Sequence, residues 1–456
     1  MDRRPAALKL KTSQRAAADE AWLAGTALLQ SGAQGANLVL EAELQRAVHS
    51  CRVAGLHRLA AAGYRTLQQL ENLHASRSGF RLAGLSWDVY QWLAVAHALR
   101  TASDAVDVRW VGEARRGYTD VGSLGLFGLF TEAVASATGY AGVVTYFADT
   151  SASVWSLGDV APGDAGRCRF AYVTPLELGE ATVQHRSLSR GGLHLEHARA
   201  AANHRLGIGR HLVASVADGL AWTQPPLADL FATSLAAQLE RIWAARDEDE
   251  RRSGDDLVFL RATVEGATST SLLLRAEQRL LHAVAPSAHA EFAYRQNLDL
   301  LSRSVGLGLW LIGRVVLSRP RTLQLLAIWS PDLAVPEDWF GRVNLALDQL
   351  LPSHLPGARG ASASDAPDTA RFDPLLLLAR RLEQVLLAGA SAASPLAMAG
   401  FLRDEADLQR NQLPTAAALL RRLRQAVAED LPEAWLAARI YLAAAETRLQ
   451  REAWLA

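Results

Sequence analysis

The stretch VGLGLWLIGRVVLSRPRTLQLLAIW occupies residues 305–329 and indicates a fold more clearly than any other part of the chain. Four apolar side chains in this stretch fall on one face at a period of two: Leu309, Leu311, Val315 and Leu317. This alternation is typical of a β-strand with one buried face. Residues 318–321 contain a proline that favours a turn, and residues 322–329 continue in leucine, isoleucine and tryptophan. The stretch therefore predicts a β-hairpin, and a hairpin requires a sheet around it.

The composition of the whole chain narrows its class. A length of 456 residues corresponds to roughly two to four domains, and a hydrophobic content of 50% is ample for buried cores. Lys9 and Lys11 are the only lysines, so 47 − 2 = 45 of the basic residues are arginine. This bias indicates a GC-rich, bacterial genome. It also excludes a Schiff-base lysine or a Gly-Lys-Ser phosphate site outside the N-terminal tail.

Charge and cysteine content indicate a soluble cytoplasmic protein. The 47 basic and 47 acidic residues cancel, so no global field attracts nucleic acid or an anionic membrane. Two cysteines, Cys51 and Cys168, are too few for a disulfide framework or a cysteine-built zinc site. Polar residues interrupt the uncharged windows 21–40 and 385–402, and the N-terminus does not resemble a signal peptide. We therefore expect no membrane segment.

The order of helical and strand-like segments predicts an α+β multidomain chain. The two β-rich regions are expected to form a partly closed barrel or a mixed sheet around one amphipathic helix, which begins at Pro225 and buries one stripe from Leu227 to Trp243. In the first β-rich region we predict strands at Gly142–Trp155, Arg169–Val173 and Ala181–His185. The predicted segments are a helical N-terminal region (1–106), a first β-rich region (107–224), the connecting helix (225–254), a second β-rich region (255–351), a linker (352–374) and a C-terminal helical bundle (375–456).

One local motif suggests contact with nucleic acid. In LHRLAAAGYRTLQQL, residues 56–70, Gly63 is suited to end a helix, and Thr66 with Gln69 forms a capping box for the next. The stretch resembles half of a helix-hairpin-helix, whose turn amides hold a phosphate. The second glycine usual in that turn is absent. The resemblance implies Arg58, Gly63 and Arg65 as nucleic-acid contacts, and the alternative is a capped helical corner.

Four histidines form a candidate metal site: His194, His197, His204 and His211. If residues 193–213 were helical, the last three would repeat every seven residues near one face. Gly207, Gly209 and neighbouring arginines argue against a helix and against a cation, so a solvated histidine-arginine surface is the alternative. No other metal and no cofactor is predicted.

The C-terminal segment leads to the predicted function. Leucines surround nearly the whole circumference of its first helix, so we expect it to pack on the β-rich regions or to bind another protein. Nucleophile elbows, paired-histidine zinc helices and phosphate-binding loops are absent from the sequence. We therefore expect a non-catalytic partner-binding or scaffold subunit of a bacterial cytoplasmic multiprotein system, whose partner is encoded nearby. Nucleic-acid binding through the helical turn and a β face is the first alternative, and an enzyme with a histidine-rich site is the second.

Overall fold

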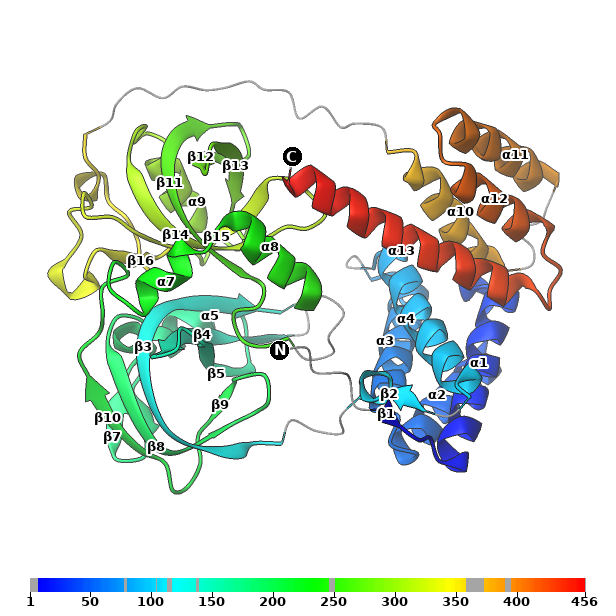
Figure 1. Ribbon diagram of the computed structural model, residues 1–456, viewed down its shortest axis with the longest axis horizontal. Coiled ribbons are helices and arrows are strands. Elements are labelled where there is room, and N and C mark those ends of the chain that lie inside the picture. Colours follow the sequence, from blue (N-terminus) through cyan, green and yellow to red (C-terminus); the bar gives the residue numbers. More distant parts are fainter. Residues whose placement is uncertain are drawn as a thin grey trace. The chain divides into compact units, whose positions relative to one another are not determined.

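The computed structural model confirms the α+β multidomain fold, with helices at both ends of the chain and antiparallel sheets between them (Figure 1). It describes residues 7–77, 80–103, 105–112, 117–136, 139–245, 251–357, 373–389 and 395–455. The chain divides into a helical unit, residues 1–115 and 369–451, and a barrel unit, residues 116–368 and 452–456. Most of the predicted linker, residues 358–372, lies outside the described residues, and the domain limits drawn from the sequence stay predictions.

Helices from the two ends of the chain build the helical unit together. One core contains leucines of the N-terminal helices, such as Leu28 and Leu93, and leucines of the C-terminal helices, such as Leu382 and Leu420. Trp435 Nε1 also donates to the Leu382 carbonyl at 2.9 Å. The apolar surface of the C-terminal helices is therefore largely buried within this chain. The helices of this unit are α1 (Thr12–Ser31), α2 (Leu38–Val53), α3 (His57–His74), α4 (Leu82–Thr101), α10 (Leu375–Ala388), α11 (Pro395–Arg410), α12 (Pro414–Gln425) and α13 (Leu431–Leu455), with a short strand pair β1 (Ala7–Leu8) and β2 (Val106–Asp107).

The first sheet of the barrel unit has the strand order β10-β8-β3-β4-β5. The long strand β3 pairs with β8 through its N-terminal half and with β4 through its C-terminal half. Ser156 of β5 forms a parallel β-bridge with Arg205, so the sheet curls into a partly closed barrel. The elements of this region are β3 (Thr119–Ala135), β4 (Tyr140–Asp149), β5 (Val154–Pro162), α5 (Gly166–Val173), β6 (Leu176–Leu178), β7 (Ala181–Val183), α6 (His185–Leu188), β8 (Gly192–Ala200), β9 (Leu206–Gly207) and β10 (Val213–Ala217).

The second sheet repeats this connectivity and closes further. Its order is β13-β12-β11-β14-β15-β16, and a parallel pairing of β13 with β15 closes the first five strands into a ring. The predicted hairpin of residues 305–329 is confirmed as β14 and β15. The elements of this region are α7 (Leu227–Ala232), α8 (Leu235–Ala244), β11 (Leu257–Ala267), β12 (Leu272–Ala276), β13 (Arg279–Val284), α9 (Tyr294–Leu301), β14 (Gly308–Val315), β15 (Thr322–Trp329) and β16 (Arg342–Asn344).

Both barrels thus place a three-stranded meander first, a helix next, and the fourth strand against the other edge of the first strand. The third and fifth strands are parallel neighbours, because β13 pairs with β15 and Ser156 bridges Arg205 just before β9. In the first barrel β9 and β10 together take the place of the fifth strand, since both pair with β8 as β15 pairs with β14. This is the connectivity of the five-stranded Greek-key barrel called the OB-fold. The barrel unit is accordingly a structural duplication, which the aligned sequences of its halves do not reveal.

Three local predictions differ from the structure. Gly142–Trp155 is not one strand, because a turn divides it between β4 and β5. Arg169–Val173 lies in helix α5 and is not a strand. The predicted continuous helix Leu227–Trp243 is two helices, because Ser234 interrupts it and caps α8 by accepting from the Ala237 amide at 3.3 Å. The glycine-spaced residues 122–128 belong to β3, the longest strand of the described chain. Gly128 is required there, because a Cβ would lie 2.0 Å from the Leu188 carbonyl oxygen.

Candidate functional site

The expected helical turn at Gly63 is absent, because α3 runs without a break from His57 to His74. Gly63 instead lets helices approach: a Cβ there would lie 2.6 Å from Val48 Cγ2 and 3.2 Å from the Trp92 ring. Helix interiors tolerate glycine where close packing compensates for its entropic cost. Without a turn, no turn amides are available to a phosphate, and the helix-hairpin-helix prediction is wrong in its geometry.

The two arginines predicted with Gly63 interact within the protein. Arg65 Nε lies 3.0 Å from a carboxylate oxygen of Asp88, whose pKa is raised by burial against the lowering effect of Arg65. Arg58 lies over the Trp110 ring, with 5.1 Å between the guanidinium carbon and the ring centroid. Nucleic-acid binding by these residues stays a prediction.

The four candidate histidines are not brought together on a helix. His194 and His197 lie exposed on strand β8, and His197 and His204 have left-handed backbone conformations. The His204 ring stacks on Trp155 with centroids 4.2 Å apart. Among the described residues, no group of three or more histidine, cysteine, aspartate or glutamate side chains is arranged to hold a metal ion. The predicted metal site therefore has no ligand set in the described structure.

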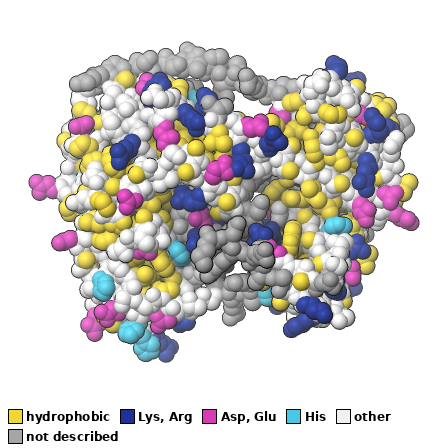
Figure 2. All heavy atoms as spheres, viewed as in Figure 1, with side chains coloured by type: hydrophobic (Ala, Val, Ile, Leu, Met, Phe, Trp, Pro, Cys, Tyr) yellow, Lys and Arg dark blue, Asp and Glu magenta, His cyan; other side chains and the backbone are white. Residues whose placement is uncertain are grey.

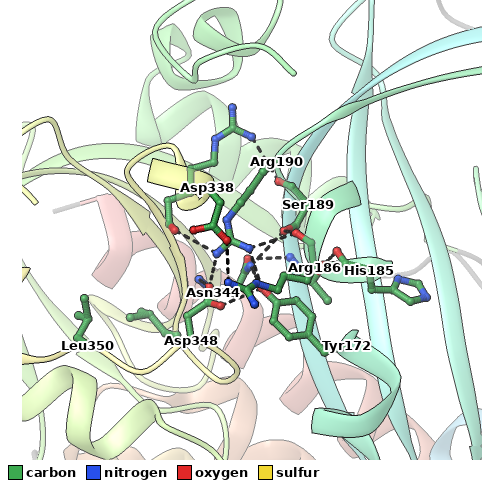
Figure 3. A network of polar contacts seen from close by, with 12 residues as sticks. Tyr172, His185, Arg186, Ser189, Arg190, Asp338, Asn344, Asp348 and Leu350 are labelled. Atoms are coloured by element: carbon green, nitrogen blue, oxygen red, sulfur yellow. Dashed lines mark hydrogen bonds and ion pairs between the residues drawn. The ribbon is translucent and has the colours of Figure 1, made fainter. Parts of the chain in front are cut away.

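A dense polar network lies inside the barrel unit (Figure 3). Asp348 accepts hydrogen bonds from Arg190 Nη2 at 2.5 Å, from the Tyr172 hydroxyl at 2.9 Å and from the Asn344 amide at 2.7 Å. Asn344 Nδ2 donates to the Tyr172 hydroxyl at 2.8 Å and to the Ser189 hydroxyl at 3.2 Å. The network joins the first barrel to the segment around β16 of the second.

This network resembles a catalytic cluster in composition, but its position favours a structural role. The side chains of Arg190 and Asp348 are 2% and 3% exposed, so a substrate cannot reach them without local unfolding. Arg342 donates to the carbonyls of Gly128, Ser189 and Leu220. Burial and the nearby charge of Arg190 lower the pKa of Arg342 to about 9. Backbone and carboxylate acceptors thus compensate for charges that the two barrels enclose.

His185 titrates in the same interior. It is 1% exposed, its Nδ1 lies 2.7 Å from the Thr145 hydroxyl, and that hydroxyl lies 2.7 Å from the Thr131 hydroxyl. Its Nε2 is buried without a hydrogen-bond partner in the described structure. Burial lowers the pKa of His185 to about 4, against the opposing attraction of Asp159.

The buried imidazole predicts acid sensitivity. Its folded-state pKa of about 4 lies below the ordinary histidine value of about 6.5, so the unfolded chain binds the proton more readily between these values. The stabilisation is fully present above pH 6.5 and is lost as the pH falls towards 4, by about 3 kcal/mol in total. Urea unfolding of the wild type and of His185→Gln at pH 7 and pH 4.5 measures this. We expect a smaller loss of stability in the variant, and equal losses would contradict the assignment.

A groove with a volume of about 770 Å³ lies between α2 and α3 in the helical unit. Each helix lines it with residues three or four positions apart, so one continuous face of each helix forms one wall. We call this feature the α2–α3 groove. Its lining residues are Leu38, Glu41, Gln45, Val48, His49, Arg52, Tyr64, Leu67, Gln68, Glu71, His74 and Ala75.

Apolar side chains along the groove are exposed. Leu38 is 83% exposed and Tyr64 is 61% exposed, and Val48 and Leu67 are partly buried between them. At one end, Glu41 lies 2.9 Å from His74 Nδ1 and Glu71 lies 2.9 Å from Arg77, so both carboxylates there have a partner within the protein.

The other end of the groove has a different charge. Arg52 forms no ion pair within the described residues and stands beside His49. The groove therefore combines apolar side chains with polar ones and, among the described side chains, carries an unpaired positive charge at the Arg52 end. No sequence pattern pointed to the groove, because Leu38 and Val48 are the only apolar residues that α2 contributes to its lining.

Comparisons with known proteins give no relative. No protein-family model matches the chain, and no curated protein or solved structure is similar to it. The structure also contains no helix, among the described residues, long and apolar enough to cross a membrane.

Proposed function

We propose that this chain is a non-catalytic partner-binding protein that receives an amphipathic helix of another protein in the α2–α3 groove. The observation that carries the proposal is an open groove lined by exposed Leu38 and Tyr64 on two packed helices. An amphipathic helix laid into an apolar groove is a recurring mode of recognition, and its anchors repeat at the spacing of the groove's own residues.

The dimensions and openness of the groove favour a helix over a small molecule. From Leu38 to Arg52 the wall spans fourteen helical steps, about 21 Å at 1.5 Å per residue, which accommodates roughly four turns of a second helix. Small ligands are usually enclosed over most of their surface, whereas the apolar groups here stand largely in solvent. A helical ridge of leucine or phenylalanine would bury Leu38, Val48 and Tyr64 together.

The charge of the groove gives the partner helix a direction. Arg52 lacks an ion-pair partner in the described structure, whereas Glu71 pairs with Arg77 and Glu41 shares a hydrogen bond with His74. A carboxylate on the partner helix could pair with Arg52 at this end of the groove. The described residues of the opposite end offer no unpaired charge for such a pair. We therefore propose a partner helix with an apolar ridge and an acidic residue at one end.

We also propose that the protein acts in the cytoplasm of a bacterium. The arginine bias supports a bacterial origin, and the unpaired, buried Cys51 and Cys168 agree with a reducing cytoplasm. Charged side chains of both signs are scattered over the face seen in Figure 2. This distribution favours a protein partner over a polyanion, which would need a broad surface of one charge. The groove replaces the C-terminal helices as the proposed docking surface, since their leucines are buried with α1–α4.

Site-specific photo-crosslinking in the native host tests the proposal. A photoreactive residue at Tyr64, inside the groove, is compared with one at Leu23 of α1, which is 67% exposed and does not line the groove. We expect one protein to be captured from Tyr64 and not from Leu23, and its crosslinked peptide to be an amphipathic helix. Capture of the same proteins from both positions, or of none from Tyr64, would contradict it.

The barrel connectivity favours nucleic-acid binding as the second candidate. Barrels of this connectivity bind oligonucleotides on the face of their second and third strands, although a fold alone does not fix function. In the second barrel these strands, β12 and β13, contain no tryptophan, tyrosine or phenylalanine on which bases could stack. Binding of single-stranded DNA that weakens steeply with salt would favour this candidate over the groove.

A further inference from the structure

We propose that strand β10 of the first barrel binds an extended segment of a partner protein, which adds to the sheet as a further strand. This site is independent of the α2–α3 groove. The inference comes from the duplication: the second barrel shows which strand pairs at the position that has no strand partner in the first, within the described residues.

In the second barrel, β16 covers the edge of the fifth strand. Arg342–Asn344 pairs antiparallel with the last three residues of β15. Val343 lies opposite Ile328, and both side chains are fully buried. Across the barrel wall, Leu260, Leu311, Ile328 and Val343 follow one another in register on four neighbouring strands. β16 therefore completes both the backbone ladder and the apolar interior.

The equivalent edge of the first barrel pairs with no further strand in the described structure. β10 pairs with β8 alone, and its last three residues, Ser215, Val216 and Ala217, are all exposed. Val216 lies opposite Leu193, which is 1% exposed in the barrel core, so Val216 shares the face of the interior. It is nevertheless 65% exposed. Leu126, Leu193 and Val216 therefore lie in register on three neighbouring strands. The equivalent residues of the second barrel lie on four strands, the fourth being Val343 of β16.

The sequence of β10 does not protect this edge. Natural edge strands are commonly blunted by charged side chains, prolines or bulges, and Val-Ala-Ser-Val-Ala contains neither charge nor proline and pairs with β8 in unbroken register. The turn at Gly179 lies against Leu212 and Val213, and β7 lies beside the strand without pairing with it, so the uncovered part of β10 is its last three residues. Unpaired backbone groups beside an uncovered apolar side chain are the features of a strand-addition site.

The second barrel also specifies the chemistry of the occupant. It is an extended segment without proline, whose residue opposite Val216 is apolar and β-branched, as Val343 is opposite Ile328. The flanking side chains would point away from the core, as those of Arg342 and Asn344 alternate with Val343, and can be polar. A second copy of the chain, paired β10 to β10, is the competing occupant.

The test uses the full chain and a labelled peptide of residues 341–346, Gly-Arg-Val-Asn-Leu-Ala, which contains β16. We expect weak, saturable binding in fluorescence polarisation. N-methylation of alternate peptide amides should abolish it, because backbone pairing is blocked while the side chains remain. Val216→Lys should weaken binding about tenfold, or about 1.4 kcal/mol. Val213→Lys, on the opposite face of the same strand, is the matched control and should leave it nearly unchanged.

Two results would overturn the proposal. Absence of saturable binding up to about 1 mM, or equal binding of the N-methylated peptide, would exclude strand addition at this edge. Sedimentation of the full chain as a dimer that Val216→Lys converts to a monomer would assign the edge to a second copy. Circular dichroism of both lysine variants verifies that the fold is retained, as expected at positions 65% and 46% exposed.

Discussion

Asp348→Ala is expected to lower the free energy of unfolding of the barrel unit by about 3–5 kcal/mol, because it leaves a buried guanidinium without its anion. Asp348 accepts from Arg190, Tyr172 and the Asn344 amide, and both charged side chains are at most 3% exposed. For a unit of this size the loss corresponds to a fall in Tm of roughly 10 °C. Differential scanning calorimetry of the full chain measures it.

The matched control for Asp348→Ala is Glu265→Ala, which removes an exposed ion pair with Arg275 at 2.8 Å. Exposed pairs contribute little to stability, so its Tm should equal that of the wild type. If the two variants unfolded at the same temperature, the buried network would not hold the barrels together.

Gly32→Ala is expected to destabilise the helical unit by roughly 2–4 kcal/mol. Gly32 ends α1 with φ of 78°, a conformation unfavourable to alanine, and a Cβ would lie 2.5 Å from the Gly389 nitrogen and 2.6 Å from the Ala388 carbonyl carbon. These are backbone atoms at the end of α10, so no side-chain rotation relieves the clash. Denaturant unfolding followed by circular dichroism measures the change.

Gly35→Ala is the control for Gly32→Ala, because no atom lies within 4 Å of the corresponding Cβ position. We expect its stability to match the wild type. Equal effects of the two substitutions would mean that the ends of α1 and α10 are not in contact. That result would contradict the packing of the N- and C-terminal helices around one core.

The features that the sequence predicted are those with local causes. The hairpin of residues 305–329 follows from period-two alternation and a proline turn, and its Leu309 and Leu311 are both buried in the barrel core. The fold class followed in the same way from the order of segments. At Gly63, by contrast, the local signals for a helix cap also fit a helix interior, and the contact with Trp92 decided between them.

The remaining features depend on pairings between distant segments. Leucines of α10 are buried with α1–α4, more than 270 residues earlier in the chain, and no periodicity encodes that choice. The Arg190–Asp348 pair joins residues 158 positions apart. Strand β3 escaped detection because glycines at 122, 125 and 128 weaken its strand propensity, whereas the structure uses Gly128 for close backbone packing.

The candidate site was missed for a different physical reason. The α2–α3 groove consists of ordinary helical residues that become a site only when two helices lie side by side with their outward faces aligned. Of the residues that stood out in the sequence, His194 and His197 lie on β8, His204 and His211 lie in turns after it, and Arg58 and Arg65 lie on α3. Residue type alone therefore pointed away from the groove.

Calorimetric titration of the purified partner into three forms of the full chain tests the central claim most directly. The forms are the wild type, the groove variant Leu38→Glu/Tyr64→Glu and the control Leu23→Glu, each changed only at exposed positions. We predict that the groove variant weakens Kd at least a hundredfold, about 2.8 kcal/mol, and that the control leaves it unchanged. Equal Kd values for all three forms would contradict docking in the α2–α3 groove.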